Sequence, residues 1–401
     1  MMYGKLKYIF KVILGGNKVV NRRVVIVDFN HQVHTYFHSN HRLSAPIIVD
    51  GKVIEKDTTI QSGCIKNVHR WSNHGTNPMA ICFDRPVPAR KAFWQSVFPE
   101  MSLGSGKEYK GNREKMPDAM FEGISDCERL LRMAGVSCFA YKNYEADDLV
   151  FACVQRAKEK YPDLPIDVIT NDADLLPLVD DRVSVFLRSR KLTWAEDKSI
   201  EKAHYVQVTK ENFETVVGDL SAYRGFYLPY NTILLHKLLR GDSSDNFVRK
   251  EISRKFPKTK FNDMMLRMVE DNRNVDDIFK YGKPQYEIYN KITKEVFNGT
   301  MEEAKNSPDK ANFRMRVKNS EELDLILTLM SMYTDMTDEQ LEIVKNVYLG
   351  MNLNQPYVNA DKNLCRHEYR VGVTESTDID VFSEIELQRC LEPLKIRLNI
   401  Y

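Results

Sequence analysis

Short, continuously apolar runs alternate with segments of helical periodicity through the first half of the chain. Unbroken apolar runs of four or five residues are typical of strands that are buried on both faces of a parallel sheet. The clearest of them span residues 24–27, 80–83, 136–140, 166–170 and 183–187. Helical periodicity between these runs predicts covering helices, for example at residues 58–71. The pattern therefore predicts an α/β fold, with a mostly parallel sheet and helices on both faces.

Three further features of the pattern predict how the chain is divided. Asp50-Gly51 lies between alternating apolar residues at 47–54, which predicts a hairpin. Pro117-Asp118 opens a predicted helix that Gly135 would cap. Beyond about residue 201 the periodicity becomes helical and stays so to about Leu349. We therefore expect an N-terminal extension at 1–20, a sheet domain at 21–203, a helical domain at 204–350 and a tail at 351–401.

Composition narrows the class of protein only slightly. The chain has 401 residues, 43% hydrophobic and 10% aromatic, and its formal net charge is +2, so charge alone indicates no nucleic-acid partner. The seven cysteines include no Cys-x-x-Cys pair, which favours buried thiols in a reducing compartment. The sequence contains no run of 18 apolar residues, so no membrane span is predicted. The N-terminal residues have no signal-peptide cleavage site, and we expect a cytoplasmic protein.

Carboxylates follow the predicted strands. Asp28 and Asp84 end the first two runs, and Asp172 and Asp174 follow the run at 166–170. A denser group stands at the start of a predicted helix after the third run, and it consists of Glu145, Asp147 and Asp148. Acidic residues in a first helical turn can simply cap the helix. However, like charges repel unless a cation or proton holds them, and ligands of such sheets bind beyond the carboxyl ends of the strands. The whole set predicts a shared divalent-metal site.

Two basic regions suggest a nucleic-acid partner. Between residues 85 and 115, basic residues alternate with aromatic ones, a pattern that suits single-stranded nucleic acid, although a solvated loop is the alternative. The second region follows Asp242 and Asp245, where the aspartates could add metal ligands or could cap a helix, and the cations could contact phosphates or be solvated. The candidates for nucleic-acid contact are Arg85, Arg90, Lys91, Tyr109, Arg249, Lys250, Arg254 and Lys255.

The chemistry of these side chains selects the cation and the reaction. Oxygen ligands without a cysteine or histidine cluster favour Mg²⁺ or Mn²⁺ over zinc. His31, His34, His38 and His41 share one helical face, but four ligands from one helix cannot converge on a tetrahedral ion. The number of carboxylates favours two ions, which suit in-line phosphodiester displacement. The residues therefore predict metal-dependent phosphoryl transfer on nucleic acid.

The ordered set of motifs resembles the 5′-nuclease (flap endonuclease) superfamily, and within it the phage 5′→3′ exonucleases and phage ribonuclease H. The resemblance covers about residues 22–260. It rests on Val27-Asp28, Phe83-Asp84, Tyr109-Lys110-Gly111-Asn112-Arg113, Glu145-Ala146-Asp147-Asp148, Asp172-Ala173-Asp174 and Gly241-Asp242-x-x-Asp245-Asn246. It implies a PIN-like domain with a helical arch at about 85–135, followed by a helical DNA-binding domain.

The resemblance also implies roles for single residues. Asp28, Asp84, Glu145 and Asp147 would serve one of two Mg²⁺ ions, for which Mn²⁺ could substitute. The second ion would be served, directly or through water, by Asp148, Asp172, Asp174, Asp242 and Asp245. Lys110 and Arg113 match basic residues that reach the scissile phosphate, and His34 stands where an aromatic often stacks on a base. The glycines of the family's helix-hairpin-helix are missing after Asn246, so that motif is degenerate and potassium is not expected.

The leading hypothesis is a monomeric 5′-nuclease that removes RNA primers or 5′ flaps during replication or repair. Its substrates would be branched or nicked duplex DNA and RNA–DNA hybrids with a 5′ end, and single-strand-binding or replication proteins would be partners. One alternative is a PIN-type ribonuclease for single-stranded RNA, which would not need Asp242 or Asp245. The other is a catalytically silent protein that binds DNA junctions, which the complete acidic set argues against.

Overall fold

A computed structural model gives the fold. It describes residues 22–40, 42–49, 51–73, 77–87, 91, 95, 110–111, 115–133, 136–141, 144–188, 205–241, 250–271, 285–299, 301–318 and 321–351. Within these ranges no helix combines the length and the apolar character needed to cross a membrane. About half of the expected arch at 85–135 lies outside the described residues, and the helix that closes that stretch, α5 (Asp118–Met133), is present.

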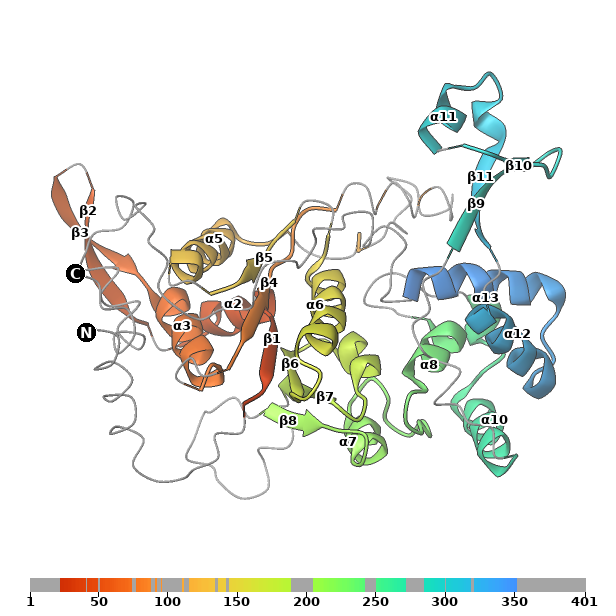
Figure 1. Cartoon of the computed structure of the whole chain (residues 1–401), viewed down its shortest axis with the longest axis horizontal. Helices are drawn as coiled ribbons and strands as arrows, with labels where there is room; N and C mark the ends of the chain where they lie inside the picture. Colours follow the sequence, from red (N-terminus) through yellow and green to blue (C-terminus); the bar gives the residue numbers. More distant parts are fainter. Residues whose placement is uncertain are drawn as a thin grey trace, which may run out of the picture.

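A six-stranded sheet forms the centre of the molecule, in the order β5-β4-β1-β6-β7-β8 (Figure 1). Its first five members are mutually parallel, and β8 is antiparallel to β7 at the edge. The strands are β1 (Val24–Asp28), β4 (Met79–Cys82), β5 (Cys138–Phe139), β6 (Ile166–Thr170), β7 (Val183–Arg188) and β8 (Tyr205–Val208). The predicted α/β class with a mostly parallel sheet is confirmed.

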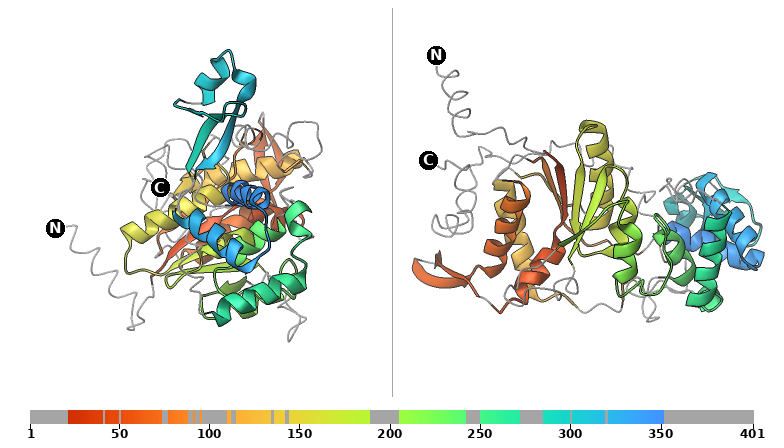
Figure 2. Two further views of the ribbon diagram at one scale, coloured as in Figure 1. Left: turned by 90° about the vertical axis from the view of Figure 1, so that its right-hand side faces the viewer. Right: turned by 90° about the horizontal axis from the view of Figure 1, so that it is seen from below.

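Alternate residues of β1 face two different hydrophobic cores, which explains why the strand is apolar throughout. Val24 and Ile26 pack in the core that contains Leu149 of α6 (Ala146–Lys160). Val25 and Val27 pack in a second core. That second core contains residues of α2 (Asn30–Phe37), α3 (Thr59–Trp71) and α5. Successive side chains of a strand point to opposite faces, so helices cover both sides of the sheet, as predicted (Figure 2).

Two local predictions near the N-terminal half are also confirmed. As predicted, β2 (Ser44–Val49) and β3 (Lys52–Asp57) form an antiparallel hairpin that projects from the body (Figure 1). Gly51 has a φ of 73°, a conformation that glycine adopts without strain. Five cysteines of the described chain are buried free thiols, at positions 64, 82, 127, 138 and 153.

The second half of the chain is mainly helical but not throughout. Its helices are α7 (Phe213–Asp219), α8 (Ile233–Arg240), α9 (Lys250–Ser253), α10 (Lys258–Glu270), α11 (Met301–Asn306), α12 (Glu321–Tyr333) and α13 (Asp338–Met351), with a 3₁₀ turn η5 (Lys310–Asn312). The expectation of helix to about Leu349 is wrong between α10 and α12. There β9 (Gln285–Asn290), β10 (Val296–Phe297) and β11 (Phe313–Lys318) form an antiparallel sheet.

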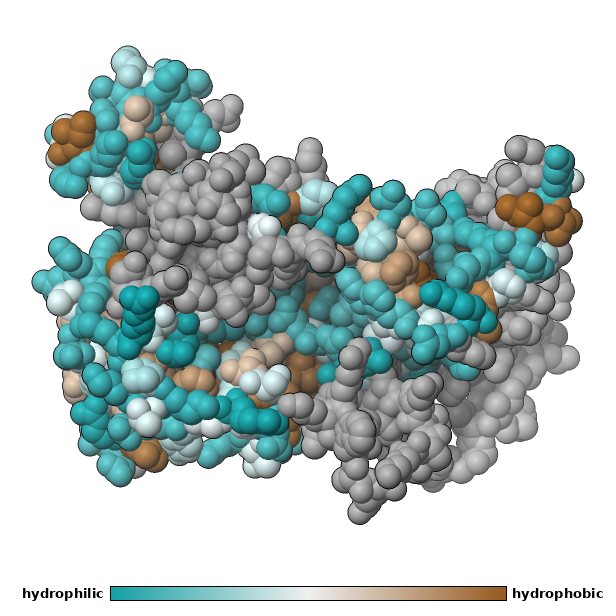
Figure 3. Space-filling view, turned by 180° about the vertical axis from the view of Figure 1, so that it is seen from behind, coloured by the Kyte–Doolittle hydropathy of each residue, from teal (hydrophilic) through white to brown (hydrophobic). Residues whose placement is uncertain are grey.

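This three-stranded unit and the β2–β3 hairpin stand at opposite ends of the molecule, and both expose apolar side chains (Figure 3). Val53 and Ile54 are exposed on the hairpin, and Ile292 and Val296 on the three-stranded unit. Between them, the core on the α6 side of the sheet runs without a break into α8, α10, α12 and α13. The sheet itself continues through β8 to residue 208, past the expected boundary at 203/204. The division into two domains stays a prediction.

Candidate metal centre

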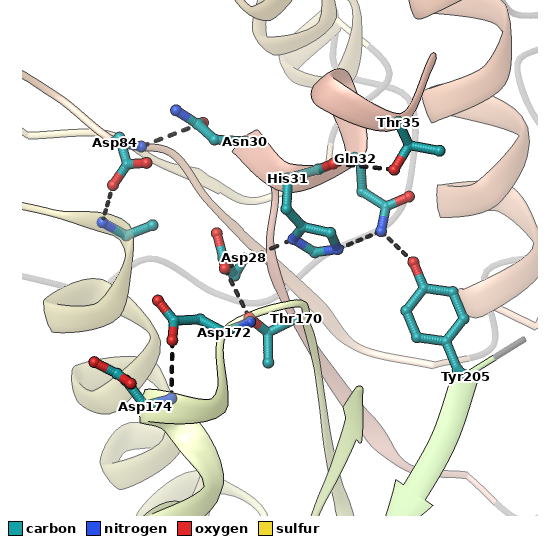
Figure 4. A network of polar contacts seen from close by, with 11 residues as sticks. Asp28, Asn30, His31, Gln32, Thr35, Asp84, Thr170, Asp172, Asp174 and Tyr205 are labelled. Carbon is teal, nitrogen blue, oxygen red and sulfur yellow. Dashed lines mark hydrogen bonds and ion pairs between the residues drawn. The ribbon is translucent and has the colours of Figure 1, made fainter. Parts of the chain in front are cut away.

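The carboxyl ends of β1 and β6 are joined by one hydroxyl group. Asp28 is the last residue of β1, and Thr170 is the last residue of the neighbouring β6. The Thr170 hydroxyl donates to Asp28 Oδ2 at 2.7 Å, and its oxygen accepts the backbone N–H of Asp172 at 2.9 Å (Figure 4). Asp28 and Thr170 are both buried. Thr170 therefore holds Asp28 and the loop that carries Asp172 at the same edge of the sheet.

Asp84 reaches this edge from β4. It follows the strand by two residues, and its backbone N–H donates to the side-chain oxygen of Asn30 at 3.4 Å. Its own Oδ1 accepts the backbone N–H of Ala146, the first residue of α6, at 2.7 Å. A helix N-terminus attracts negative charge because its first N–H groups have no partner within the helix. The Asp84 carboxylate is thereby held against the start of α6.

Glu145 and Asp148 form a capping box at the same helix end. The Glu145 side chain accepts the backbone N–H of Asp148, and Asp148 Oδ2 accepts the backbone N–H of Glu145 at 2.9 Å. Both side chains are buried. This reciprocal pair satisfies two N–H groups and fixes the start of α6. Both carboxylates therefore cap the helix, as the alternative explanation proposed, and the capping hydrogen bonds also make their positions rigid.

Asp147 stands between them in sequence and takes no part in the capping box. Desolvation raises its pKa well above the ordinary value, and the nearby carboxylates of Asp172 and Asp28 raise it further. Lys110 acts in the opposite direction and lowers the pKa. Because Asp147 responds to charges on three other elements, it lies within the acidic cluster rather than on the outer face of α6.

Asp84 has a similarly perturbed carboxyl group. Desolvation by surrounding protein atoms raises its pKa to about 6, and Asp28 adds to the rise. The residue nevertheless exposes part of its surface to solvent, so the carboxylate is crowded on one side and open on the other. A carboxylate cluster that is both crowded and accessible holds protons more readily than usual and is suited to exchange them for cations.

Two lysines supply positive charge to the cluster. Lys110 Nζ donates to Glu145 Oε1 at 3.0 Å. Lys110 has a φ of 55°, in the left-handed region that non-glycine residues rarely adopt. Lys237, a buried residue of α8, forms an ion pair with Asp174 Oδ2. One lysine therefore reaches the site from the stretch between β4 and α5, and the other from the helical part of the chain.

Asp172 and Asp174 lie on the turn after β6. Asp172 caps the 3₁₀ helix η2 (Ala173–Leu178), because its Oδ1 accepts the backbone N–H of Asp174 at 2.8 Å. The short helix that follows Asp172 is thus a 3₁₀ helix rather than an α-helix. Figure 4 shows the two aspartates on the side of the turn that faces Asp28.

The structure brings together seven of the nine predicted metal ligands, from β1, the β4 end, α6 and the β6 turn. Asp242 and Asp245 lie outside the described residues, as does the predicted catalytic Arg113. Among the described side chains, no group of three or more His, Cys, Asp or Glu residues is placed to hold a metal ion in this arrangement. Capping hydrogen bonds and the two lysines occupy several of the carboxylate oxygens. The all-oxygen donors of the cluster fit a hard divalent cation.

The residues expected to contact nucleic acid are placed unevenly. Arg85 is tied to Glu128 of α5 and to its neighbour's carbonyl oxygen. His34 is exposed on α2 and stacks on His38, with ring centroids 6.4 Å apart. Lys91 and Arg254 are exposed, and Lys255 Nζ donates to the Asp335 carbonyl oxygen at 3.4 Å. Lys250 begins α9. Arg90, Tyr109 and Arg249 lie outside the described residues.

Sequence reasoning missed Thr170, Asn30 and Lys237. Neutral Thr170 and Asn30 act on carboxylate residues through hydrogen bonds, and a search for acidic residues cannot find such partners. Residues 233–239 are apolar apart from His236 and Lys237, so a lysine charge within this buried helix was the available signal. Buried lysines are almost always paired, and this pairing predicts an acidic partner.

Residues 23–210 match the family described as "5'-3' exonuclease, N-terminal resolvase-like domain". By this similarity, residues 23–210 are called the nuclease domain. The matched range begins just before β1 and ends just after β8, so the nuclease domain comprises the whole six-stranded sheet.

Curated relatives of the nuclease domain include DNA polymerase I of Caldicellulosiruptor bescii, 31% identical over 169 residues, which are 42% of this chain and 16% of that protein. The 5'-3' exonuclease of Aquifex aeolicus is 24% identical over 191 residues, 47% of this chain and 62% of that protein. The chain thus spans less than a fifth of its DNA polymerase I relatives. A bacteriophage T5 flap endonuclease, solved with DNA and metal ions, superimposes with a TM-score of 0.46 at 13% identity, over 94% of this chain and 99% of that one.

Proposed function

We propose that the chain is a Mg²⁺-dependent, structure-specific 5′-nuclease that hydrolyses phosphodiester bonds at the carboxyl edge of its sheet. One observation carries the proposal: carboxylates from β1, the β4 end, α6 and the β6 turn share a single cluster in which the pKa of Asp84 is raised to about 6 and that of Asp147 is raised well above its ordinary value. Folding energy is spent on holding like charges together, which a purely structural role does not require.

The carboxylates divide between two cation positions in this proposal. Asp28, Asp84, Glu145 and Asp147 would hold one Mg²⁺ ion. The turn residues Asp172 and Asp174 would serve the other, with Asp148, Asp242 and Asp245. When bound, two such ions supply an activated water and stabilise the leaving oxygen of the cleaved phosphodiester. The hydrogen bonds from Thr170, from Ala146 and within the capping box fix the ligands before any cation arrives.

Lys110 and Lys237 would balance the charge of the site during turnover. Lys110 lies on the solvent side of Glu145 with about a fifth of its side chain exposed (18%), which leaves it accessible to a phosphate group. In the proposed complex it turns from Glu145 to the scissile phosphate as cations take over the carboxylates, together with Arg113. Lys237 is more deeply enclosed, at 9% side-chain exposure, and stays with Asp174.

The proposed substrates are nicked or branched duplex DNA and RNA–DNA hybrids with a 5′ end, which suits the removal of primers or flaps in replication or repair. This choice is supported by the similarity of residues 23–210 to the 5′-3′ exonuclease family. Exposed cations beyond the sheet support it, because Arg254, Lys258 and Lys260 lie together on and just before α10. Positive side chains of this kind contact phosphates and position a duplex without reading its sequence.

A cleavage panel tests the proposal. The purified full chain is incubated with 5′-labelled flap duplex, nicked duplex and single-stranded RNA, with Mg²⁺ or with EDTA. We expect release from the flap and nicked duplexes, none in EDTA, and loss of release in Asp174→Ala. Release from single-stranded RNA alone would instead identify a PIN-type ribonuclease. Equal release by wild type and Asp174→Ala would show that the proposed metal centre is not needed for cleavage.

A further inference from the structure

A histidine lies directly behind the Asp28 carboxylate. His31 is in the first turn of α2, and its Nδ1 atom is 3.6 Å from Asp28 Oδ2. Its side chain is 11% exposed, and that of Asp28 10%. Figure 4 shows the ring between Asp28 on one side and Gln32 on the other. Two roles are open to such a histidine: a nitrogen ligand for a cation, or a donor that orients the carboxylate.

The neighbour of the ring on its other side is fully enclosed. Gln32 is 1% exposed. Its Nε2 atom lies 2.5 Å from His31 Nε2 and also donates to the Tyr205 hydroxyl oxygen. Its Oε1 atom accepts from Asn67 Nδ2 of α3 at 3.0 Å. The Asn67 contact sets the orientation of the Gln32 amide, because a flipped amide would place a donor against the Asn67 N–H. The Tyr205 hydroxyl and the His31 ring nitrogen can each donate or accept and fit this orientation.

The orientation of Gln32 decides which ring nitrogen of His31 accepts a hydrogen bond. An amide nitrogen can only donate, so in this contact His31 Nε2 is the acceptor. The ring N–H then lies at Nδ1, a buried atom that faces Asp28 Oδ2 at 3.6 Å and has no hydrogen bond within the described structure. A nitrogen that carries a proton has no lone pair to offer a cation. The geometry therefore favours the donor role over the ligand role.

The other histidines of the helix give no competing explanation. His34 and His38 are exposed and stack on one another rather than on Asp28. Tyr205, at the other end of these contacts, is held firmly in place. It lies on β8, and its ring packs edge-on against Trp71, with ring centroids 5.9 Å apart and an interplanar angle of 90°. Tyr205, Gln32 and His31 thus form a continuous polar connection from the edge strand of the sheet to Asp28.

We propose that His31 is a positioning residue, oriented by Gln32, Asn67 and Tyr205, that holds the Asp28 carboxylate for a divalent cation and does not itself bind the cation. The inference rests on the proposed function of the cluster as a metal centre. Partners of this kind orient metal-binding carboxylates and imidazoles, and their loss weakens metal binding or activity by roughly 10–100-fold.

The test compares His31→Leu, His31→Asn and Tyr205→Phe with wild type, and uses the exposed His38→Gln as the matched control. Mn²⁺ affinity is measured by calorimetry, and the Mg²⁺ concentration for half-maximal cleavage is measured beside the KM for flap DNA. We expect His31→Leu to weaken both cation measures about 10-fold or more with an unchanged DNA KM. His31→Asn, whose amide can still donate to Asp28, should recover most of the loss, and Tyr205→Phe should show a smaller effect in the same direction.

Three results would overturn the inference: unchanged cation affinity in a folded His31→Leu variant, no recovery in His31→Asn, or a changed Mn²⁺-to-Mg²⁺ preference in His31→Leu, which would identify a lost nitrogen ligand. The effect in His38→Gln must be absent. Calorimetry separates this inference from the proposed function, because Mn²⁺ affinity can depend on His31 even if wild-type protein cleaves no flap. Conversely, if the wild type cleaves flap DNA and its cation affinity does not depend on His31, only the inference about His31 is contradicted.

Discussion

Lys110 Nζ donates to Glu145 Oε1 at 3.0 Å, and both side chains are largely shielded from solvent. The contact joins the stretch before α5 to the start of α6. Lys110 also lowers the pKa of both Asp84 and Asp147. One cation from the protein therefore partly neutralises three carboxylates of the proposed metal centre, and its removal should be felt across the whole cluster.

Lys110→Met should lower the cleavage rate at saturating flap DNA by about 100-fold, the usual scale for losing one charged group that acts on the reacting phosphate. Lys115→Met is the matched control, because Lys115 forms an exposed ion pair with Asp118 (side chains 90% and 89% exposed). Exposed ion pairs of this kind contribute little to protein stability. Single-turnover cleavage rates test this prediction, and equal rates for the two variants would show that Lys110 does not act on the reacting phosphate.

Asp84→Asn should become more stable relative to wild type as the pH rises from about 4 to 7 in the absence of divalent cations. The folded pKa of Asp84 is about 6, above the ordinary 3.8. The folded state therefore binds the proton more readily than the unfolded state, and this contribution to stability is lost as pH rises through the folded pKa. The asparagine oxygen can still accept from Ala146, so the helix end is preserved.

Thermal unfolding in EDTA measures the difference between these two proteins at each pH. Adding Mg²⁺ at pH 7 supplies the control, since it should raise the Tm of wild type more than that of Asp84→Asn. A difference between the proteins that does not change with pH would mean that Asp84 titrates normally in the folded chain.

Asp148→Ala and Asp147→Ala should have opposite effects on the stability of the metal-free protein. Asp148 accepts the Glu145 N–H in the capping box, so its loss should cost about 1–2 kcal/mol. Asp147 has no such bond and is crowded by like charges, so its loss should cost nothing or stabilise. Urea unfolding in EDTA gives both values, and equal destabilisation would refute the division of roles.

Gly63→Ala should destabilise the nuclease domain by about 1–3 kcal/mol, the usual cost of overpacking. A methyl group at Gly63 of α3 would lie 2.3 Å from the Tyr36 ring of α2, so the ring or the two helices would have to shift. Gly218 of α7 has nothing within 4 Å, and Gly218→Ala should be neutral or slightly stabilising. Denaturant midpoints test the pair, and similar effects would show that α2 and α3 are not tightly packed.

The central sheet and most of the acidic cluster could be predicted from the sequence because both depend on local patterns. Val24–Val27 is apolar at every position since both faces are buried, and strand-end carboxylates must meet where parallel strands end. The β8 strand was not predicted, because Tyr205–Val208 is partly exposed and its partner strand determines its pairing. The β9–β11 sheet was missed for the same reason.

Contacts between distant residues were beyond sequence reasoning. Nothing local to Thr170 indicates that its hydroxyl binds Asp28, 142 residues away. The orientation of Gln32 depends on Asn67 and Tyr205, which belong to two other elements. Long-range hydrogen bonds follow from the packing of the elements, so they become visible only with the fold.

The most direct test of the central claim is single-turnover release of a 5′-labelled flap with Mg²⁺ by wild type and by Asp28→Asn. The asparagine keeps the shape of Asp28 and an acceptor for Thr170, and removes only the charge at the centre of the cluster. The account predicts release by the wild type and a loss of at least about 100-fold in the variant. No release by the wild type, or equal release by both proteins, would contradict it.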